Sequence, residues 1–471
     1  MKNAKVFLPV AAVVLLFTSG FAGTRARGAQ ADQLAKGTVI AKVICKADAK
    51  QSYALYLPSN YTAEKRWPVL YCFDPAGRGA RPVERFKDAA EKYGYIVAGS
   101  NNSRNGPNQP VLASIAAMWD DTHARFSIDK GRVYTTGHSG GARVAMRAGL
   151  MCKSCVTGVI ANGAGFPPDI PPSASTSFII YGMLGIDDFN FPELKRLDET
   201  LAGLGITHRV EFFEGPHQWA PKESCTEAIE WMEVQAMKAG RREKDAAMIR
   251  ELFETRVAKA RGLEEAGKAY ESYLAQAAIA EDFKGLIDVS DIERKVAGLG
   301  ESKEVRQAAK DEREQVRRQL KYAEEIKAIG RRFLNPLERN DALLELRRIS
   351  ADLQKRSKVP EDTGDRRVAR RTINQVYAEL FESALYLYRN EPDLMVINLE
   401  VASELTPGYS HVFYELACAY SLKGDKKKAI ETLKKSLDKG FKDIATIESD
   451  ERLAAIRQEP EYKRLIEGLK K

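Results

Sequence analysis

The pentapeptide Gly137-His138-Ser139-Gly140-Gly141 stands between two runs of opposite backbone preference. Residues 132–136 are rich in strand-forming side chains, and residues 142–148 have the composition of a helix. A serine in a tight turn between a strand and a helix needs neighbours that are almost without side chains, because the two elements approach closely there. The first N–H groups of the helix point at whatever the serine attacks. The pattern makes Ser139 a candidate nucleophile; an ordinary glycine-rich turn is the alternative.

Strand-like and helix-like runs alternate between residues 38 and 238. Two strand-like runs separated by polar residues, 38–44 and 53–57, predict a hairpin. Further strands are expected at 69–73, 95–98, 132–136, 157–162, 177–182 and 209–213, and helices at 82–93, 111–126, 142–148, 193–203 and 224–238. This alternation predicts an α/β fold with a doubly wound, mostly parallel sheet that helices cover on both faces. The functional site is then expected at the carboxyl ends of the strands.

A nucleophilic serine needs a base, and the chain has five histidines. His217 follows the last strand, where a side chain can reach the functional edge of the sheet. The other four are less suitable, because they lie inside helices, at a strand start or within the pentapeptide with a diverging side chain: His123, His411, His208 and His138. Position and elimination therefore favour His217 as the base.

An acid must orient the imidazole and stabilise its charged form. Asp187 and Asp188 both follow the strand at 177–182. Adjacent carboxylates should not both point inward, because like charges repel. We choose Asp188, which the Gly-x-x-Asp spacing places at the tip of the loop, and expect Asp187 to be solvated or to cap the next helix. Asp169 is the alternative acid.

Two N–H donors are needed to bind an oxyanion. Gly140, directly after the serine, is expected to supply one of them. The second should come from the loop after the strand at 69–73. Pro75 has no N–H group, so Ala76 is the candidate and Gly77 the alternative, although residues 74–77 also fit an ordinary turn.

Four motifs together resemble the polyhydroxybutyrate depolymerase and feruloyl esterase-like branch of the α/β-hydrolases over about residues 38–238. They are residues 71–79, 137–143, 185–190 and 215–219. The order Ser139, Asp188, His217 is the α/β-hydrolase order. The resemblance implies a carboxylic-ester hydrolase without a metal or organic cofactor. Asp74-Pro75 departs from the His-Gly of many relatives. The chain has no Ser/Thr-rich linker or separate polymer-binding domain, and this lack argues against a solid polyester substrate.

The substrate pocket is expected to be shaped by two loops and three aromatic side chains. The loops are the polar residues 101–109 and the proline-rich residues 166–172, and the aromatic residues are Phe189, Phe191 and Trp219. Phe189 and Trp219 are the predicted substrate-binding residues. The sequence does not specify the substrate.

The composition changes at residue 239, where Ala, Glu, Lys, Arg and Leu begin to dominate in long amphipathic runs. About residues 375–440 resemble tetratricopeptide repeats, with Tyr386 and Leu399 one repeat length before Tyr420 and Leu433, and Gly424 in the turn between two helices. Residues 263–270 resemble part of a degenerate earlier unit. The repeats predict binding of a protein or peptide partner; a helical bundle that only packs on the hydrolase is the alternative.

These features divide the chain into residues 32–238 for catalysis, 239–374 for a helical region and 375–471 for the repeats. We interpret the charge run 365–371 as a solvated helix face. Because the three catalytic candidates precede residue 239, residues 32–238 alone are expected to hydrolyse a small ester within about tenfold of the mature rate.

Residues 1–31 have the layout of a signal peptide, with Lys2 and Lys5 before an apolar run and small residues. Candidate cleavage sites are residues 29–31 and 20–22. The run is short for a membrane span, so we expect an exported, periplasmic or secreted protein without stable membrane insertion; an uncleaved anchor is the alternative. The net charge is +8, with no basic stripe interleaved with aromatics, which argues against nucleic acid.

The chain has six cysteines, too few for a disulfide scaffold at this length. Cys152 and Cys155 form a single CxxC motif, which makes zinc binding improbable. A small disulfide or two packed thiols is the expected state of this pair.

The sequence favours an exported serine esterase that acts through Ser139, His217 and Asp188. One alternative is a repeat-based binding protein whose hydrolase fold is inactive, since fold does not imply function. Another is acyl transfer to an alcohol by the same three residues.

Overall fold

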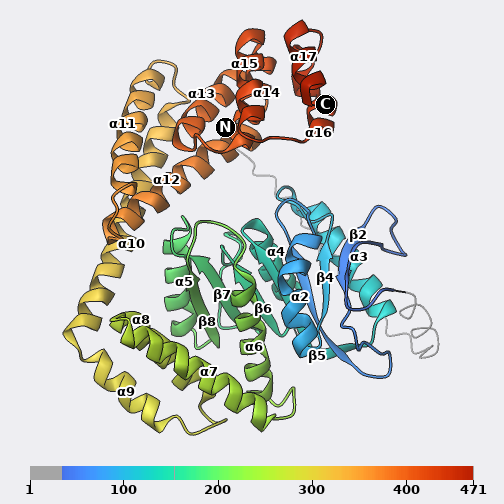
Figure 1. Ribbon diagram of the computed structural model, residues 1–471, viewed down its shortest axis with the longest axis vertical. Helices are drawn as coiled ribbons and strands as arrows, with labels where there is room; N and C mark the ends of the chain where they lie inside the picture. The colour runs from blue at the N-terminus through green and yellow to red at the C-terminus, as the bar shows by residue number, and fades with distance from the viewer. Residues whose placement is uncertain (1–33, 153, 470–471) are drawn as a thin grey trace, which may run out of the picture.

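The structure is a computed structural model that describes residues 34–152 and 154–469. It consists of a sheet half and a helical half, and the helical half extends along one side of the sheet half and over its upper end (Figure 1). The expected signal peptide lies outside the described residues.

Within the described residues, eight strands form one sheet in the order β1-β2-β4-β3-β5-β6-β7-β8. The strands are β1 (Val39–Ile44), β2 (Ser52–Tyr56), β3 (Trp67–Phe73), β4 (Ile96–Ser100), β5 (Ile128–His138), β6 (Gly158–Asn162), β7 (Ile179–Gly185) and β8 (His208–Phe213). The β1–β2 and β2–β4 pairs are antiparallel, and all later pairs are parallel. The predicted hairpin and the mostly parallel sheet are confirmed.

Five helices of the sheet half cover the two faces of this sheet. They are α2 (Ala80–Tyr93), α3 (Asn108–Arg125), α4 (Gly140–Met151), α5 (Phe191–Gly203) and α6 (Lys222–Lys238). Apolar residues of α3, α4 and α5 pack in one core, and those of α2 and α6 pack in a second core on the opposite face. The inner strands β3, β4, β6 and β7 are almost wholly buried, which is why they read as nearly continuous apolar runs.

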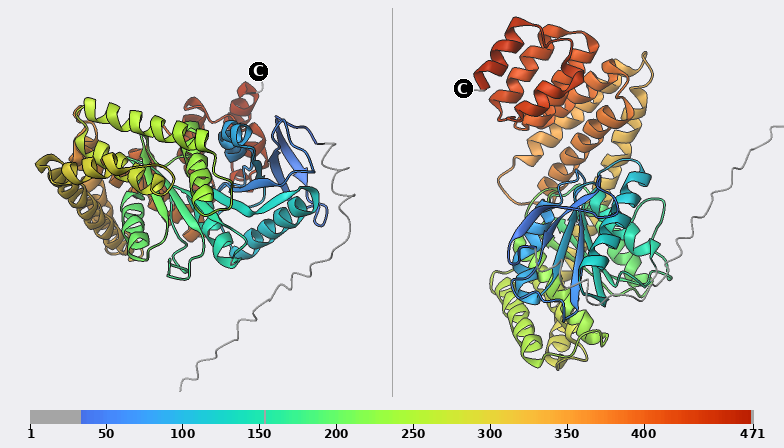
Figure 2. Two further views of the ribbon diagram at one scale, coloured as in Figure 1. Left: turned by 90° about the horizontal axis from the view of Figure 1, so that it is seen from below. Right: turned by 90° about the vertical axis from the view of Figure 1, so that its right-hand side faces the viewer.

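The helical half begins beside α6 and ends beyond the carboxyl ends of the strands (Figures 1 and 2). Its α-helices are α7 (Ala246–Glu265), α8 (Ala269–Phe283), α9 (Ser290–Gly300), α10 (Lys303–Arg332), α11 (Arg339–Ser357), α12 (Gly364–Glu382), α13 (Pro392–Leu405), α14 (Ser410–Lys423), α15 (Lys426–Asp438), α16 (Ile444–Ser449) and α17 (Pro460–Leu469). The 30-residue α10 connects the lower helices to the upper ones. Because a helix rises about 1.5 Å per residue, α10 spans roughly 45 Å.

Asp282 on α8 joins three elements of the two halves. Its buried carboxylate accepts hydrogen bonds from Arg209 on β8 at 2.9 Å, Trp231 on α6 at 2.8 Å and Arg256 on α7 at 2.9 Å. Removing one partner of such a buried network leaves a charge unpaired, which is costly. The helical half is therefore held firmly against the edge strand β8.

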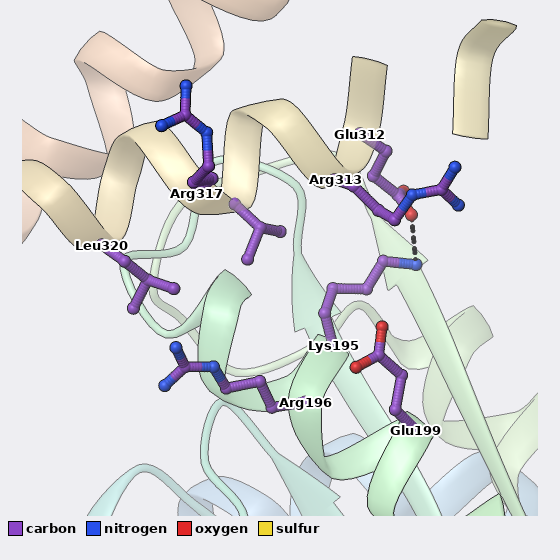
Figure 3. Close-up of a pocket in the computed structure, with 8 residues that line it drawn as sticks. Lys195, Arg196, Glu199, Glu312, Arg313, Arg317 and Leu320 are labelled. Atoms are coloured by element: carbon purple, nitrogen blue, oxygen red, sulfur yellow. Dashed lines mark ion pairs between the residues drawn. The ribbon is translucent and has the colours of Figure 1, made fainter. Parts of the chain in front are cut away.

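A groove of about 210 Å³ lies between α5 and α10. Lys195 on α5 forms an ion pair of 2.7 Å with Glu312 on α10 across it. The arginine side chains of the groove point in different directions (Figure 3), so they do not converge on one position. This groove is part of the seam between the two halves.

The expected turn between two repeat helices is confirmed at Gly424, which has φ +86° and separates α14 from α15. Asp425 then caps α15 by accepting a hydrogen bond from Lys428 N at 3.1 Å. Tyr386 and Tyr420, which the sequence matches by spacing, differ in their packing. Tyr420 is 6% exposed, whereas Tyr386 lies in a π-helical turn, η1 (Ser383–Leu387), and is 58% exposed. The assignment of tetratricopeptide repeats stays a prediction.

Cys152 and Cys155 form a disulfide just after α4. The other cysteines, Cys45, Cys72, Cys225 and Cys418, are buried free thiols. The single CxxC motif is thus a local cross-link in this structure.

Candidate active site

Ser139 lies in the turn between β5 and α4 with φ +54° and ψ −123°. A positive φ is rare for a side chain larger than that of glycine and marks a strained position. Two neighbouring glycines make the turn possible: a Cβ on Gly137 would lie 2.1 Å from Gly141 O, and a Cβ on Gly141 would lie 2.1 Å from Phe73 O. The expected strand, tight turn and helix around Ser139 are all present.

His217 and Asp188 are joined by a hydrogen bond of 2.8 Å between Nδ1 and Oδ2. Asp188 is fully buried, and its other oxygen accepts a hydrogen bond from Asn190 N at 2.8 Å. The structure thus places the carboxylate so that it holds one ring nitrogen of the imidazole and leaves the other available.

The ring of His217 also contacts two aromatic rings at the site. Its centroid lies 4.4 Å from that of Phe189 and 4.6 Å from that of His138. Phe189 lines the same cavity as Ser139, so imidazole and serine belong to one site. Within the described residues, no hydrogen bond joins Ser139 Oγ to the His217 ring. In unliganded enzymes such catalytic bonds are often long and tighten when substrate binds.

Asp187 is neither solvated nor a helix cap, so this expectation is wrong. Its carboxylate accepts a hydrogen bond of 3.0 Å from Arg370 on α12 and is 15% exposed. Asp169, the alternative acid, pairs instead with Arg147 at 2.7 Å. Of the three candidates, the structure brings Asp188 to His217.

Ala76 does not offer a free N–H group, which corrects the expectation for the oxyanion site. Its N–H donates to Asp74 Oδ1 at 2.9 Å, and the N–H of the alternative, Gly77, donates to the Asp74 carbonyl at 3.0 Å. Both bonds belong to a turn in which the aspartate side chain captures the amide two residues later. Gly140 remains as a donor in the first turn of α4, where N–H groups have no intrahelical partner.

Asn105 is the polar side chain packed against Gly140. A Cβ on Gly140 would lie 1.9 Å from Asn105 Oδ1 and 3.1 Å from its Nδ2, and both residues line the cavity with Ser139. The sequence had indicated the loop of residues 101–109 as a pocket wall but not this residue. The feature of the sequence that could have indicated Asn105 is its position in a polar loop that follows the end of a strand.

The cavity beside Ser139 has a volume of about 440 Å³. Both predicted loops contribute to it, and so does Phe189. A further wall comes from α12 of the helical half. The lining residues from these four sources are Arg104, Asn105, Gly106, Asn108, Pro167, Pro168, Asp169, Phe189, Gln375, Ala378, Glu379 and Glu382.

The α12 wall carries two carboxyl groups. Loss of solvation raises the pKa of Glu379 and of Glu382, and for Glu382 the nearby His217 and Arg143 oppose this shift. This wall could not be predicted from local sequence patterns, because the residues involved are more than 150 positions after His217. The cavity therefore has a wall outside residues 32–238, and the activity expected of residues 32–238 alone stays a prediction.

Trp219 and Phe191 do not line the cavity, so the expectation that they shape it is wrong. The geometry likewise does not support the predicted substrate-binding role of Trp219. Trp219 is 2% exposed, and its indole N–H donates to Asp74 Oδ2 at 3.0 Å. Burial alone would raise the pKa of Asp74, but hydrogen bonds, including the one from Trp219, outweigh it and lower that pKa. The ring of Phe191 lies 3.4 Å from the guanidinium of Arg371 on α12.

The remaining histidines have other surroundings. His138 is buried beside His217 and Trp219, and this burial lowers its pKa well below the usual value. His208, the first residue of β8, pairs with Asp198 on α5 at 3.1 Å, so it lies at the opposite end of β8 from the loop that carries His217. His138 thus stays neutral and packs behind the base.

Within residues 34–152 and 154–469, no cluster of His, Cys, Asp or Glu side chains could hold a metal ion. Of the helices that the structure describes, none combines the length and apolar character that crossing a membrane requires.

The sheet order, the helices on both faces and the strand–serine–helix turn define an α/β-hydrolase fold, here joined to a large all-helical half. No protein-family model matches the chain, and no curated protein matches its sequence.

Solved structures are similar to about two fifths of the chain. One is S-formylglutathione hydrolase from Staphylococcus aureus, with 15% identity, a TM-score of 0.34 and coverage of 42% of this chain and 98% of that one. Another is the feruloyl esterase module from Clostridium thermocellum, with 12% identity, a TM-score of 0.35 and coverage of 43% and 90%. Esterase B from Lactobacillus rhamnosis has 14% identity, a TM-score of 0.35 and coverage of 44% and 89%. The fold assignment rests on the strand order and connections described above.

Proposed function

We propose that this protein is an exported serine hydrolase that cleaves carboxylic esters through an acyl-enzyme. The observation that carries the proposal is the arrangement of Ser139 in a strained strand-to-helix turn beside a His217–Asp188 pair with a 2.8 Å hydrogen bond. A strained turn persists only where the surrounding structure holds it, and such positions cluster at active sites.

In the proposed reaction, Ser139 Oγ attacks the ester carbonyl while His217 Nε2 takes its proton. Asp188 holds Nδ1–H and stabilises the imidazolium that forms. His217 then gives the proton to the departing alcohol, which leaves an ester between the acyl group and Ser139. A water molecule, deprotonated by His217, attacks this ester and releases the carboxylic acid.

The negative charge on the tetrahedral oxygen would be bound by Gly140 N–H and by the side-chain amide of Asn105. The Gly140 N–H is placed by the first turn of α4, where the helix dipole also favours negative charge. Asn105 takes the place that Ala76 cannot fill, because the Ala76 N–H is held by Asp74. A preorganised donor of this kind contributes about 3–4 kcal/mol to the transition state.

The helical half is proposed to bind part of a large substrate or a protein or peptide partner. Supporting this role, α12 forms one wall of the cavity, so a substrate held at Ser139 would contact both halves. Export to the periplasm or the medium is proposed from the amino-terminal sequence pattern alone.

The decisive experiment uses a short p-nitrophenyl ester and a fluorophosphonate probe that reacts with activated serines. We expect wild-type protein to hydrolyse the ester and to be labelled, and Ser139→Ala to do neither while its circular dichroism is unchanged. Equal labelling of both proteins would refute Ser139 as nucleophile. No hydrolysis of esters of any acyl length, together with no labelling, would favour a binding protein with an inactive hydrolase fold.

A further inference from the structure

The loop that carries the acid, residues 186–190, divides its hydrogen bonds between the two halves of the molecule. We call it the acid loop. Its N–H groups bind the sheet half: Ile186 N donates to Phe213 O at 2.9 Å, and Asp187 N donates to Gly215 O at 3.0 Å. These acceptors lie at the end of β8 and in the segment that leads to His217. One side of the acid loop is thus fixed to the strand and loop that carry the base.

Three carbonyl groups of the acid loop, those of Ile186, Asp187 and Phe189, bind side chains of the helical half instead. These bonds run from Arg371 Nε to Ile186 O at 2.6 Å, from Asn374 Nδ2 to Asp187 O at 3.3 Å and from Gln319 Nε2 to Phe189 O at 2.7 Å. Backbone polar groups that are shielded from water need partners, and here α10 and α12 supply them. The second side of the acid loop is therefore held from outside the sheet half.

Arg371 has the most unusual position among these side chains. It is 1% exposed, its guanidinium lies 3.4 Å from the ring centroid of Phe191, and one of its Nη atoms lacks a hydrogen-bond partner within the described residues. Burial lowers its pKa to about 10, so it is still protonated at neutral pH. Burying a charge that is incompletely paired costs stability. Stability alone therefore does not explain an arginine at this point.

We propose that Arg371 is a positioning residue of the active site, which acts through the Ile186 carbonyl to hold the acid loop where Asp188 meets His217. The inference rests on the proposed function for its kinetic consequences, but the contact itself is independent of the substrate. A misplacement of about 1 Å in a catalytic group can cost roughly 100-fold in rate. Asp188 is two residues from the carbonyl that Arg371 binds, so a shift of the acid loop moves it directly.

The test compares Arg371→Met with Arg366→Met in the full chain. Methionine keeps much of the side-chain length but donates no hydrogen bond. Arg366 lies on the same helix and donates to Pro360 O at 3.1 Å, within the helical half. We expect Arg371→Met to lower kcat on a small ester about 10- to 100-fold with KM within about twofold, and Arg366→Met to match wild type. Arg371→Lys should recover part of the kcat, because an ammonium group can still donate to the carbonyl.

A second measurement reports on the His217–Asp188 pair without any substrate. The proton shared by an imidazole Nδ1 and a carboxylate gives a far-downfield proton NMR signal. We expect this signal in wild type and Arg366→Met, and its loss or a clear upfield shift in Arg371→Met. A purely structural role of Arg371 would change the unfolding midpoint without moving this signal.

The proposal is overturned if folded Arg371→Met retains both wild-type kcat and the downfield signal. Should Arg371→Met not fold, Arg371→Leu decides by the same two measurements, and wild-type values in that variant would equally overturn the proposal. If wild type hydrolyses no ester and Ser139 is not labelled, the proposed function fails. The downfield signal then still tests the positioning role of Arg371.

Discussion

Asp187 and Asp188 are adjacent carboxylates that bind partners in opposite halves of the molecule. Asp188 accepts a hydrogen bond from His217 in the sheet half, whereas Asp187 accepts one from Arg370 on α12. Successive side chains in this loop diverge, so the repulsion expected of two neighbouring carboxylates is relieved by cations and donors on either side. The two residues therefore make a matched pair for testing the acid.

We expect Asp188→Asn to lower kcat by about four orders of magnitude, because an amide favours the wrong tautomer of the histidine. Asp187→Asn should cost at most a few-fold, because a partly exposed ion pair contributes on the order of 1 kcal/mol or less. Steady-state kinetics on a small ester measures both variants. A larger loss in Asp187→Asn than in Asp188→Asn would reassign the acid.

The sheet half could be predicted well from the sequence because its signals are local. The strands are continuous apolar runs. The glycines around Ser139 are needed because the backbone of the strand and that of the helix approach closely there. The loops at the strand ends restrict where a base and an acid can lie. Asp188 and His217 follow from that edge of the sheet. Each of these inferences uses residues within one strand–loop–helix unit.

The contacts between the halves could not be predicted, because a local pattern does not specify what packs on it. The charge run 365–371 has the composition of a solvated helix face, yet Arg371 is buried and binds a carbonyl 185 residues earlier. The prediction for Ala76 was wrong for a different reason, because its N–H donates to the side chain of Asp74, two residues earlier, within a turn. Trp219 follows the base in sequence, but its indole N–H needs a partner when buried and finds it in Asp74.

Trp219→Phe tests whether this residue supports the fold or contacts substrate. Phenylalanine fills most of the same space but leaves Asp74 without the indole donor. Loss of a hydrogen bond to a buried charged group should lower the free energy of unfolding by about 1–3 kcal/mol. We expect KM for a small ester to stay within twofold, since Trp219 does not line the cavity. Urea denaturation and kinetics separate the two effects, and a large rise in KM at unchanged stability would restore the substrate-binding role.

The lowered pKa of Asp450 leads us to expect that the stability of the last helices of the chain depends on pH. Burial opposes its ionisation, but hydrogen bonds from Arg452 and Tyr414 outweigh burial and lower its pKa to about 2. An unfolded aspartate titrates near 3.9, so the stabilising effect is complete above about pH 4 and is lost as the pH falls through 2. We expect Asp450→Asn to reduce the free energy of unfolding by about 2 kcal/mol at pH 7 and by almost nothing near pH 2.

The control for Asp450 is Asp438→Asn, an exposed residue at the end of α15. Its substitution should leave the unfolding midpoint unchanged at both pH values. A constant difference between Asp450→Asn and wild type from pH 7 to pH 2 would show that the stabilisation does not come from ionised Asp450.

The side-chain amide of Asn105 is the proposed second donor to the oxyanion. If its amide is the second donor to the oxyanion, Asn105→Ala should lower kcat by about 100-fold with little change in KM, because the bond forms only in the transition state. Asn105→Asp should cost more, since a carboxylate would repel the developing charge. Asn108→Ala is the matched control: Asn108 lines the same cavity, but the side-chain atoms nearest to Gly140 belong to Asn105, so loss of the Asn108 side chain should affect KM more than kcat. Equal kcat values in Asn105→Ala and Asn108→Ala would exclude the Asn105 amide as the second donor to the oxyanion.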